Sequence, residues 1–384
     1  MEIKNLKKAA ERIKKAVKNK EKIILYGDAD LDGVSSVIIL KETIKNLGGE
    51  VSAIHFPDRE REGYGINKEA INYLKNKVPA LLIALDCGIG NFEEIKLAKK
   101  LGFEVIIIDH HEILEKLPEA SVIVDPKQNG DKYHFKEFAA AGIVFKLSQL
   151  LLGKKLSGSL RSNFLELTAL ATISDMMPAV KENKIFIDQG LKSLEKTFRP
   201  GLKIFWQINS IKNYGSLRQI VQRIISTLNA SDADEGHLNE SYLLLTETCE
   251  EKAKRLAINL LEKSYQRQLR IREITAQVEE RILEKPKELI VFEGDPSWAL
   301  ILAGPVASRI CNRYKKPVFL FKKGESESSG AVRMPQGLDG VKAMISCKSL
   351  LETYGGHPPA AGFRIKNKNL EKFKKCLIKH FSSN

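Results

Sequence analysis

The stretch Val105-Ile106-Ile107-Ile108-Asp109-His110-His111 decides the fold and indicates the chemistry of this chain. Four consecutive β-branched residues form an apolar run that is typical of a strand buried on both faces of a sheet. An acid and two imidazoles follow where that strand ends. Open α/β sheets bind their ligands at the carboxyl ends of their strands. Carboxylate and imidazole donors without a thiolate favour a divalent cation such as Mn²⁺.

Apolar strands alternate with amphipathic helices over about the first half of the chain. We expect strands at 22–26, 50–55, 80–85, 104–108 and 121–124. We expect helices at 34–47, 67–76 and 92–101, and a mainly helical stretch from 138 to 194. This alternation predicts a parallel sheet that helices cover on both faces.

A long polar helix is expected at 247–283, rich in Glu, Lys, Arg and Gln and followed by Pro286. We interpret it as a connector between domains, and a surface helix of the first domain is the alternative. Strands are then expected at 288–292, 317–321, 330–333 and 361–365, with helices at 306–314 and 370–380. The sequence therefore predicts an α/β domain at 1–200, a helical region with the connector helix at 201–285, and a smaller α/β domain at 286–384.

The composition is that of a globular protein, with 384 residues of which 43% are hydrophobic. Lys and Arg number 62 against 48 Asp and Glu, which gives a net charge of +14. Such a surplus favours a polyanionic partner, most often nucleic acid, although a generally lysine-rich composition is the alternative.

Nothing in the sequence indicates a membrane or an oxidising compartment. The five cysteines have no metal-site or redox-motif spacing, so we expect a reducing cytoplasm: Cys87, Cys249, Cys311, Cys347 and Cys376. The apolar runs are too short to cross a bilayer, and the charged N-terminus lacks the apolar core of a signal peptide.

Three acids alternate in Gly27-Asp28-Ala29-Asp30-Leu31-Asp32-Gly33, between an apolar strand and a helix. In extended chain such carboxylates lie on one side and repel one another, so a cation would stabilise them. A Ca²⁺-type loop or an acidic helix cap is the alternative, but a loop of the EF-hand type would need a further Glu and a helix–loop–helix frame, which are missing.

Three further acidic groups stand at the ends of apolar elements. They are Asp86-Cys87-Gly88, Asp109-His110-His111 and Ser174-Asp175-Met176-Met177-Pro178. Four such groups at one edge of a sheet fit two-metal hydrolysis, in which the cations activate water and stabilise a phosphoryl transition state. A histidine beside the metals can contact phosphate or protonate a leaving group.

In this order the four groups resemble the motifs of the DHH phosphoesterase superfamily, and above all its RecJ-like exonucleases. Further RecJ-like segments are Pro57-Asp58-Arg59, Glu62-Gly63-Tyr64-Gly65 and Val124-Asp125-Pro126-Lys127-Gln128. The C-terminal part resembles the DHHA1 domain, in Val306-Ala307-Ser308-Arg309, Gly330-Ala331-Val332-Arg333, Gly355-Gly356-His357 and Ala360-Ala361-Gly362-Phe363. The resemblance implies a DHH domain joined by the connector helix to a DHHA1 domain, with the active site in the cleft between them.

The resemblance also implies roles for individual residues. One or two Mn²⁺ or Mg²⁺ ions would be held by Asp28, Asp30, Asp32, Asp86, His110 and Asp175, with Asp86 as the bridge. His111 would face the scissile phosphate, and Asp109 would orient the histidine pair. Phosphate would be bound across the cleft by Arg333 and by Gly355, Gly356 and His357, and the strand path would be lined by Arg59, Tyr64 and Arg309.

The implied function is a single-stranded DNA 5′→3′ exonuclease that releases 5′-mononucleotides in DNA repair and recombination. Its expected partners are single-stranded nucleic acid and single-strand-binding or replication proteins. A phosphodiesterase for short oligonucleotides or cyclic dinucleotides is the alternative. An inorganic pyrophosphatase fits the basic charge less well, and a non-catalytic replication scaffold fits the nearly intact acidic groups less well.

The sequence departs from the family pattern at three places. Tyr26 stands where many members carry His, and Asp28 would substitute for that ligand. Asn229-Ala230-Ser231-Asp232 keeps only the start of the family's Asn-Ala-Ala-Gly-Arg segment. The chain stops soon after Gly355-Gly356-His357, so we expect the family's C-terminal oligonucleotide-binding β-barrel to be absent. These departures affect the length of single-stranded nucleic acid that the protein can bind.

Overall fold

The computed structural model describes residues 2–60, 62–63, 65–113, 116–208, 216–233, 237–285 and 287–382. The chain forms two compact units, Met1–Ser264 and Tyr265–Asn384. Their boundary falls inside helix α12 (Glu250–Glu284), which corresponds to the expected connector helix. The three-region division at 200 and 285 stays a prediction.

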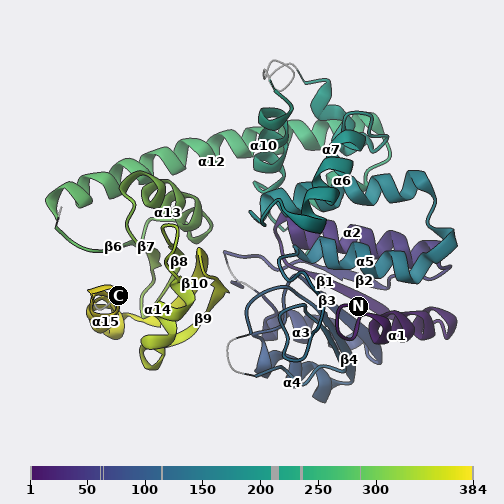
Figure 1. Cartoon of the computed structure of the whole chain (residues 1–384), viewed down its shortest axis with the longest axis horizontal. Coiled ribbons are helices and arrows are strands. Elements are labelled where there is room, and N and C mark those ends of the chain that lie inside the picture. The colour runs from purple at the N-terminus through teal and green to yellow at the C-terminus, as the bar shows by residue number, and fades with distance from the viewer. Residues whose placement is uncertain are drawn as a thin grey trace. The chain divides into compact units, whose positions relative to one another are not determined.

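The first unit is built on a five-stranded parallel sheet in the order β2-β1-β3-β4-β5 (Figure 1). The strands are β1 (Ile23–Gly27), β2 (Ala53–His55), β3 (Ala80–Leu85), β4 (Phe103–Ile108) and β5 (Val122–Val124). The chain passes outward from β1 to β2 and then returns to the other side of β1. That reversal between β1 and β3 is the topological switch point at which doubly wound sheets bind ligands.

Helices cover both faces of this sheet, as the alternation in the sequence predicted (Figure 1). Ile23 and Leu25 pack into one core with α1 (Leu6–Lys18), α2 (Leu31–Asn46), α5 (Ala140–Leu152) and α6 (Gly158–Ser174). Ile24 and Tyr26 point to the opposite face, into a smaller core with α3 (Lys68–Leu74) and α4 (Phe92–Leu101). Successive residues of the same strand are therefore buried on opposite faces.

The other helices of the first unit follow α6 along the chain. They are α7 (Lys181–Leu194), α8 (Pro200–Lys203), α10 (Leu217–Leu228), α11 (Glu240–Thr246) and the first part of α12. Short 3₁₀ turns lie at Lys75–Lys77, Gly153–Lys155 and Ile204–Trp206 in this unit, and at Lys348–Leu350 and Asn367–Asn369 in the second.

The second unit holds a mixed sheet in the order β6-β7-β8-β10-β9. Its strands are β6 (Val291–Asp295), β7 (Val318–Lys323), β8 (Glu327–Arg333), β9 (Leu351–His357) and β10 (Ala360–Lys366). Only β6 and β7 pair in parallel, and the other three pairings are antiparallel. The helices are α13 (Leu300–Tyr314), α14 (Gly340–Ser346) and α15 (Leu370–Ser382).

Two apolar layers hold the second unit together. The last turns of α12 bury Ile274 and Val278 against Val306 and Ile310 of α13. Elsewhere in the unit, aromatic rings from the sheet and from α15 pack together, namely Phe292, Phe319, Phe363 and Phe373. Cys347 and Cys376 form a disulfide, a pairing that their spacing in the sequence did not predict.

Most expected elements are present with shifted ends, but helix α14 and strand β9 of the second unit were not expected. Strand β9 was not expected, because Glu352-Thr353-Tyr354-Gly355-Gly356 has no β-branched run and two glycines lower its strand propensity. Among the described helices, none is long and apolar enough to cross a bilayer.

Candidate active site

The carboxyl ends of three neighbouring strands bring three acids together. Asp28 follows β1, Asp86 follows β3 and Asp109 follows β4. The ladder continues past the strand ends, because the Asp86 N–H donates to the Ile108 carbonyl (3.0 Å) and the Asp28 N–H to the Leu85 carbonyl (3.2 Å). The acids therefore lie side by side at the β1/β3 switch point.

The loop after β1 turns tightly into α2. The Asp30 carboxylate accepts hydrogen bonds from the N–H groups of Asp32 and Gly33, both at 3.1 Å, and so caps the helix. A Cβ at Gly33 would lie 2.2 Å from the Asp28 carbonyl oxygen, so only glycine fits there. This cap explains why α2 begins at Leu31, three residues before the expected start at Val34.

Asp32 is buried and held by the N-terminus of another helix. Its two carboxylate oxygens accept from the Ala140 N–H (2.7 Å) and the Ala141 N–H (2.8 Å), at the start of α5. The positive end of the α5 dipole favours a negative charge at this place. The sequence analysis missed this support, because a run of alanines carries no signal that it receives a carboxylate.

His110 joins carboxylates from three elements. Its Nε2 atom lies 3.1 Å from Asp86 Oδ1, 3.5 Å from Asp175 Oδ2 and 3.7 Å from Asp32 Oδ2. Asp175 reaches the group from the C-terminal end of α6. Burial, with a further contribution from His111, lowers the pKa of His110 to about 3. The ring is therefore neutral at physiological pH, which is the form that binds metals.

Two sets of donors fit divalent cations. The first set is Asp28, Asp30 and Asp86, and the second is Asp32, His110 and Asp175; in each set the ligand atoms lie within 4.8 Å of one another. Asp86 belongs to the first set and also lies against His110, so it stands between the two.

The raised pKa values of three of these carboxylates indicate a site that binds a cation. Burial first, and neighbouring acids second, raise the pKa of Asp32 and of Asp86 well above the usual range and that of Asp175 to about 7. Within the described residues, Asp86 Oδ1 and Asp175 Oδ2 are buried without a hydrogen bond. Such a cluster is stable as charged groups only with a cation.

Arg59, from the loop after β2, supplies a positive charge to the first set. Its Nη2 atom lies 2.7 Å from Asp28 Oδ2 and 3.0 Å from Asp30 Oδ2. Burial opposes ionisation of Asp30, but Arg59, together with hydrogen bonds from the Gly33 N–H and with Asp86, outweighs burial and lowers the pKa of Asp30 to about 2. Arg59 was expected on the strand path; in the structure it contacts Asp28 and Asp30, and its role toward the strand stays a prediction.

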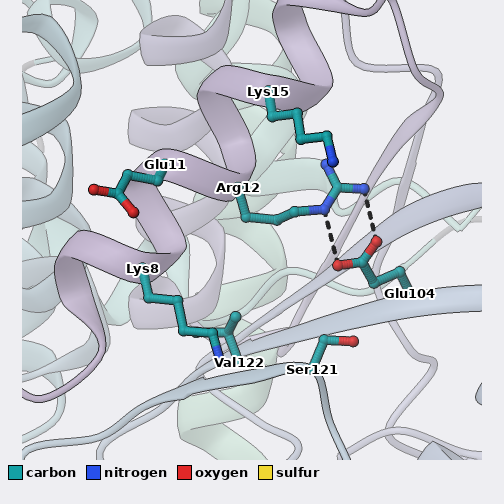
Figure 2. Close-up of a pocket in the computed structure, with 7 residues that line it drawn as sticks. All are labelled: Lys8, Glu11, Arg12, Lys15, Glu104, Ser121 and Val122. Atoms are coloured by element: carbon teal, nitrogen blue, oxygen red, sulfur yellow. Dashed lines mark hydrogen bonds and ion pairs between the residues drawn. The ribbon is translucent and has the colours of Figure 1, made fainter.

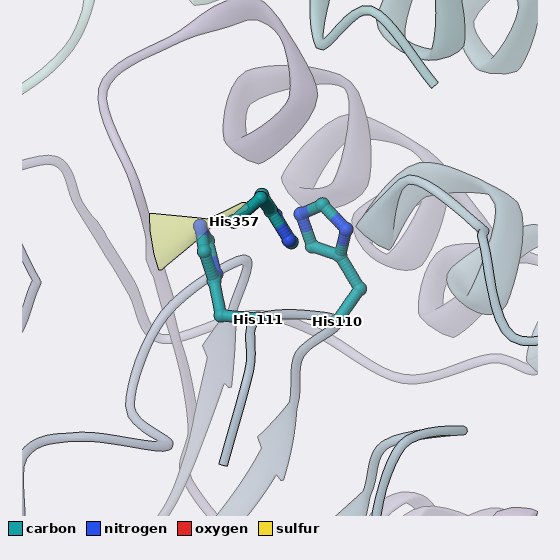
Figure 3. A group of neighbouring side chains, drawn as sticks. All are labelled: His110, His111 and His357. Carbon is teal, nitrogen blue, oxygen red and sulfur yellow. The ribbon is translucent and has the colours of Figure 1, made fainter. Parts of the chain in front are cut away.

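Asp109, which is buried, and His111, which is partly exposed, form an ion pair beside His110. The His111 Nδ1 atom lies 2.7 Å from Asp109 Oδ1, and Asp109 also accepts from the N–H groups of Ile89 and His110. Although burial opposes it, Asp109 raises the pKa of His111 to about 9. Figure 3 shows the two imidazoles on consecutive residues, with ring centroids 4.6 Å apart. A protonated ring therefore stands next to a neutral one.

In the second unit, Arg333 and His357 share one row of the sheet. Arg333 of β8 and His357 of β9 both pair with Ala360 of β10, one from each side, so the three side chains lie on one face. The Arg333 Nε atom donates to Ser308 Oγ (2.9 Å). A Cβ at Gly356 would lie 2.6 Å from the Ala361 Cα atom, which excludes other residues there.

The other residues expected to bind substrate are placed only in part. Arg309 lies on α13, where its Nη2 atom donates to Gln268 Oε1 (2.6 Å). Gly355 precedes Gly356 in β9. Tyr64 lies outside the described residues. The roles of these residues stay predictions.

The sequence analysis gave Asn229 no role, although it noted the residue as the start of a partly kept segment. Asn229 Oδ1 accepts from the Leu31 N–H (3.1 Å), and its Nδ2 donates to Ser174 Oγ (2.7 Å). Asn229 thus links the first turn of α2 to the end of α6, beside Asp175.

Tyr26 is fully buried and donates its hydroxyl to the Gly65 carbonyl, at 3.1 Å.

A hollow of about 290 Å³ lies beside the amino ends of β4 and β5, at the ends of the strands away from the acidic residues (Figure 2). It is lined by Lys8, Glu11, Arg12, Lys15, Glu104, Ser121 and Val122. Arg12 makes two hydrogen bonds to Glu104, at 2.8 and 2.7 Å, and closes one side. This salt bridge ties α1 to the start of β4, which is a structural role.

Comparison with known proteins places this geometry in a family. Residues 22–172 match the DHH family, N-terminal domain, and residues 288–383 match the DHHA1 domain. The single-stranded-DNA-specific exonuclease RecJ of Bacillus subtilis is 35% identical, over 95% of this chain and 46% of that protein. The chain thus spans about half the length of this relative.

Two further proteins match over most of both chains. YorK, from the SPbeta prophage of Bacillus subtilis, is 30% identical over 98% of this chain and 69% of its own length. A crystal structure of exonuclease RecJ bound to manganese superposes with a TM-score of 0.77 and 27% identity, over 99% of this chain and 95% of that one. The chain therefore belongs to the DHH–DHHA1 family, together with the RecJ proteins.

Proposed function

We propose that this protein is a metal-dependent phosphodiesterase that degrades single-stranded DNA from its 5′ end and releases 5′-mononucleotides. The observation that carries the proposal is the convergence of Asp32, Asp86 and Asp175 on the Nε2 atom of His110, at the switch point of the sheet. The names of the RecJ relatives support the substrate and the reaction.

We propose that the two donor sets hold Mn²⁺ or Mg²⁺. Oxygen-rich sites with one imidazole suit these ions. The similarity to a manganese-bound RecJ structure supports the same assignment. When bound, such ions lower the pKa of water and offset the charge that builds on a phosphoryl group.

The chain's own residues position the phosphate and move a proton. His111 is cationic below pH 9 and is held by Asp109, so it can donate a hydrogen bond to a phosphate oxygen or a proton to the leaving oxygen. Arg59 keeps a positive charge beside the first donor set, where its Nε and Nη2 atoms donate to Asp28 and its Nη2 atom also donates to Asp30. Asp32, fixed by the start of α5, keeps a carboxylate oriented without needing a side-chain partner.

The remaining roles follow from the family resemblance alone. We propose that Arg333, His357 and the preceding Gly355 and Gly356 bind substrate phosphate, and that Arg309 and Tyr64 line the strand path. We also propose a cytoplasmic location, with single-strand-binding or replication proteins as partners.

Hydrolysis of labelled oligonucleotides tests the proposed activity. With Mn²⁺, a 5′-labelled single strand should release labelled mononucleotide first, and a strand with a blocked 3′ end should be degraded equally well. The Asp86→Asn variant should lose activity by at least a hundredfold. Preference for duplex, or release from the 3′ end first, would contradict the proposal.

A second candidate function is hydrolysis of short oligonucleotides or cyclic dinucleotides. One observation favours it: the described residues 229–233 contain no arginine, where the family's segment ends in one. Asn229 is already engaged as a clamp. Rates on oligomers from two to thirty nucleotides separate the two functions, because a steady fall of kcat/KM with length would select the short substrates.

A further inference from the structure

Three side chains of the first unit gather outside the acidic donor sets. His55 ends β2, Glu62 lies in the loop that also carries Arg59, and His237 precedes α11. One ligand atom from each residue lies within 4.8 Å of the other two. None of the three belongs to the donor sets around Asp86, and the inference below does not rest on the proposed function.

His55 is fully buried, yet the described residues give neither of its ring nitrogens a hydrogen-bond partner. Its ring stacks on Tyr26, its partner across the β1–β2 pair, and on His237, with centroids 4.9 and 4.2 Å away. Stacking satisfies the ring faces and leaves the nitrogens unsatisfied. Buried polar atoms without a partner are rare, and a bound ion or an ordered water accounts for them.

His237 and Glu62 present the other two donors. The Nδ1 atom of His237 lies 3.9 Å from Glu62 Oε1, which is beyond hydrogen-bond distance. Glu62 Oε2 is already engaged, by the Asp58 N–H (3.2 Å) and by Asn67 Nδ2 (3.1 Å). The carboxylate is therefore oriented with its second oxygen toward His237. The backbone carbonyl of His237 accepts from the Phe56 N–H, which holds it beside β2.

We propose that His55, Glu62 and His237 bind one transition-metal ion of the zinc class, with a fourth position left to water. Imidazole donors suit Zn²⁺, whereas Mn²⁺ and Mg²⁺ prefer oxygen-rich sites such as the acidic donor sets. Three protein ligands with an open position are a known arrangement for zinc. A tetrahedral ion with metal–ligand distances of about 2.0–2.1 Å keeps its ligands roughly 3.3 Å apart, so the side chains need to close by about 1 Å.

The protonation state of His55 agrees with this assignment. Burial, and His237 beside it, lower the pKa of His55 to about 3. The imidazole is therefore neutral at physiological pH, and a lone pair is available to a metal. A bound ion would also fasten the Arg59 loop to β2, because Glu62 stands three residues after Arg59.

Cobalt absorption tests the site in the full chain. Metal-stripped protein is first given excess Mg²⁺, which is colourless and occupies the acidic donor sets, and is then titrated with Co²⁺. We expect one equivalent of Co²⁺ to give the intense visible bands of a four-coordinate ion, and Zn²⁺ to displace it. His237→Ala and Glu62→Gln should each weaken Co²⁺ binding at least tenfold.

Two matched variants separate this site from its alternatives. His134, exposed and 3.5 Å from Glu182, is another histidine–carboxylate pair, and His134→Ala should bind Co²⁺ as the wild type does. Asp86→Asn should keep the bands. Absence of four-coordinate bands, or bands that survive His237→Ala and Glu62→Gln in folded protein but vanish in Asp86→Asn, would overturn the proposal. Circular dichroism reports whether each variant is folded.

Discussion

At the scale of single residues, Arg59 competes with cations for Asp28 and Asp30. Its guanidinium lies 2.7 and 3.0 Å from these carboxylates, where an ion of the first donor set would draw on the same oxygens. Replacing Arg59 by Ala should therefore tighten Mn²⁺ binding several-fold, as measured by calorimetry. Arg12→Ala breaks another arginine–carboxylate pair, with Glu104 at the opposite ends of the strands, and should leave the Mn²⁺ affinity unchanged. Weaker binding in Arg59→Ala would show that Arg59 supports the site instead.

His111 depends on Asp109 for its charge. If the protonated ring serves the reaction, kcat/KM of the wild type should fall as the pH rises through about 9. Asp109→Asn removes the acid that raises this pKa, so the alkaline limb should move down by at least two pH units, and kcat/KM at pH 8 should drop by about tenfold or more, because the protonated fraction of His111 falls. The pH dependence of kcat/KM for both proteins, measured with saturating Mn²⁺, tests this prediction. An unchanged limb in the variant would assign that limb to another group.

The residue roles show where sequence reasoning succeeds and where it ends. Asp28, Asp86 and His110 could be predicted as neighbours because each follows an apolar strand of one parallel sheet. The position of Arg59 on Asp28 could not, because a loop of several residues has many conformations that its sequence does not distinguish. Asp32 was predicted as a ligand, but its partners at the start of α5 lie more than a hundred residues away.

At the scale of elements, the site depends on the ends of α2 and α6 meeting. Asn229 makes that junction through Leu31 and Ser174. Asn229→Ala should cost about 1 kcal/mol of stability and weaken Mn²⁺ binding several-fold, because Asp30 and Asp175 flank the two contacts. The control is Asn46→Ala, whose side chain bonds only within its own helix. Equal Mn²⁺ affinities in the two variants would remove this role from Asn229.

The elements themselves were largely predictable. Runs such as Ala80–Leu85 favour a buried strand, and their alternation with helices favours a parallel sheet. The expectation failed at β9, where pairing with β10 overrides a weak local propensity. Strand order within each sheet follows from tertiary packing and was not predicted.

At the scale of the whole molecule, the buried acids link stability to pH and to metal. The pKa values of Asp32, Asp86 and Asp175 are raised in the folded state, the last to about 7. Folding therefore favours their protonated forms, a contribution that is complete below pH 4 and is lost as the pH rises through 7. In EDTA, the melting temperature should fall between pH 5 and pH 8.

Mn²⁺ should reverse that fall, since a cation stabilises the ionised carboxylates of the folded state. Differential scanning fluorimetry of the protein with and without Mn²⁺ measures both effects. Asp175→Asn should flatten the pH dependence in EDTA. A melting temperature in EDTA that does not fall from pH 5 to pH 8 would contradict the pKa assignments.

The left-handed backbone at Asp86, with φ of +62°, decides how an inert form of this protein should be made. Asparagine and aspartate tolerate that conformation better than other residues with a side chain, so Asp86→Asn removes the charge and keeps the turn. Glutamate keeps the charge and strains the main chain. Alanine removes the charge, but it tolerates the left-handed conformation less well than asparagine does. Crystallographers who want to trap an uncut strand should therefore choose asparagine, although glutamate is the chemically closer acid.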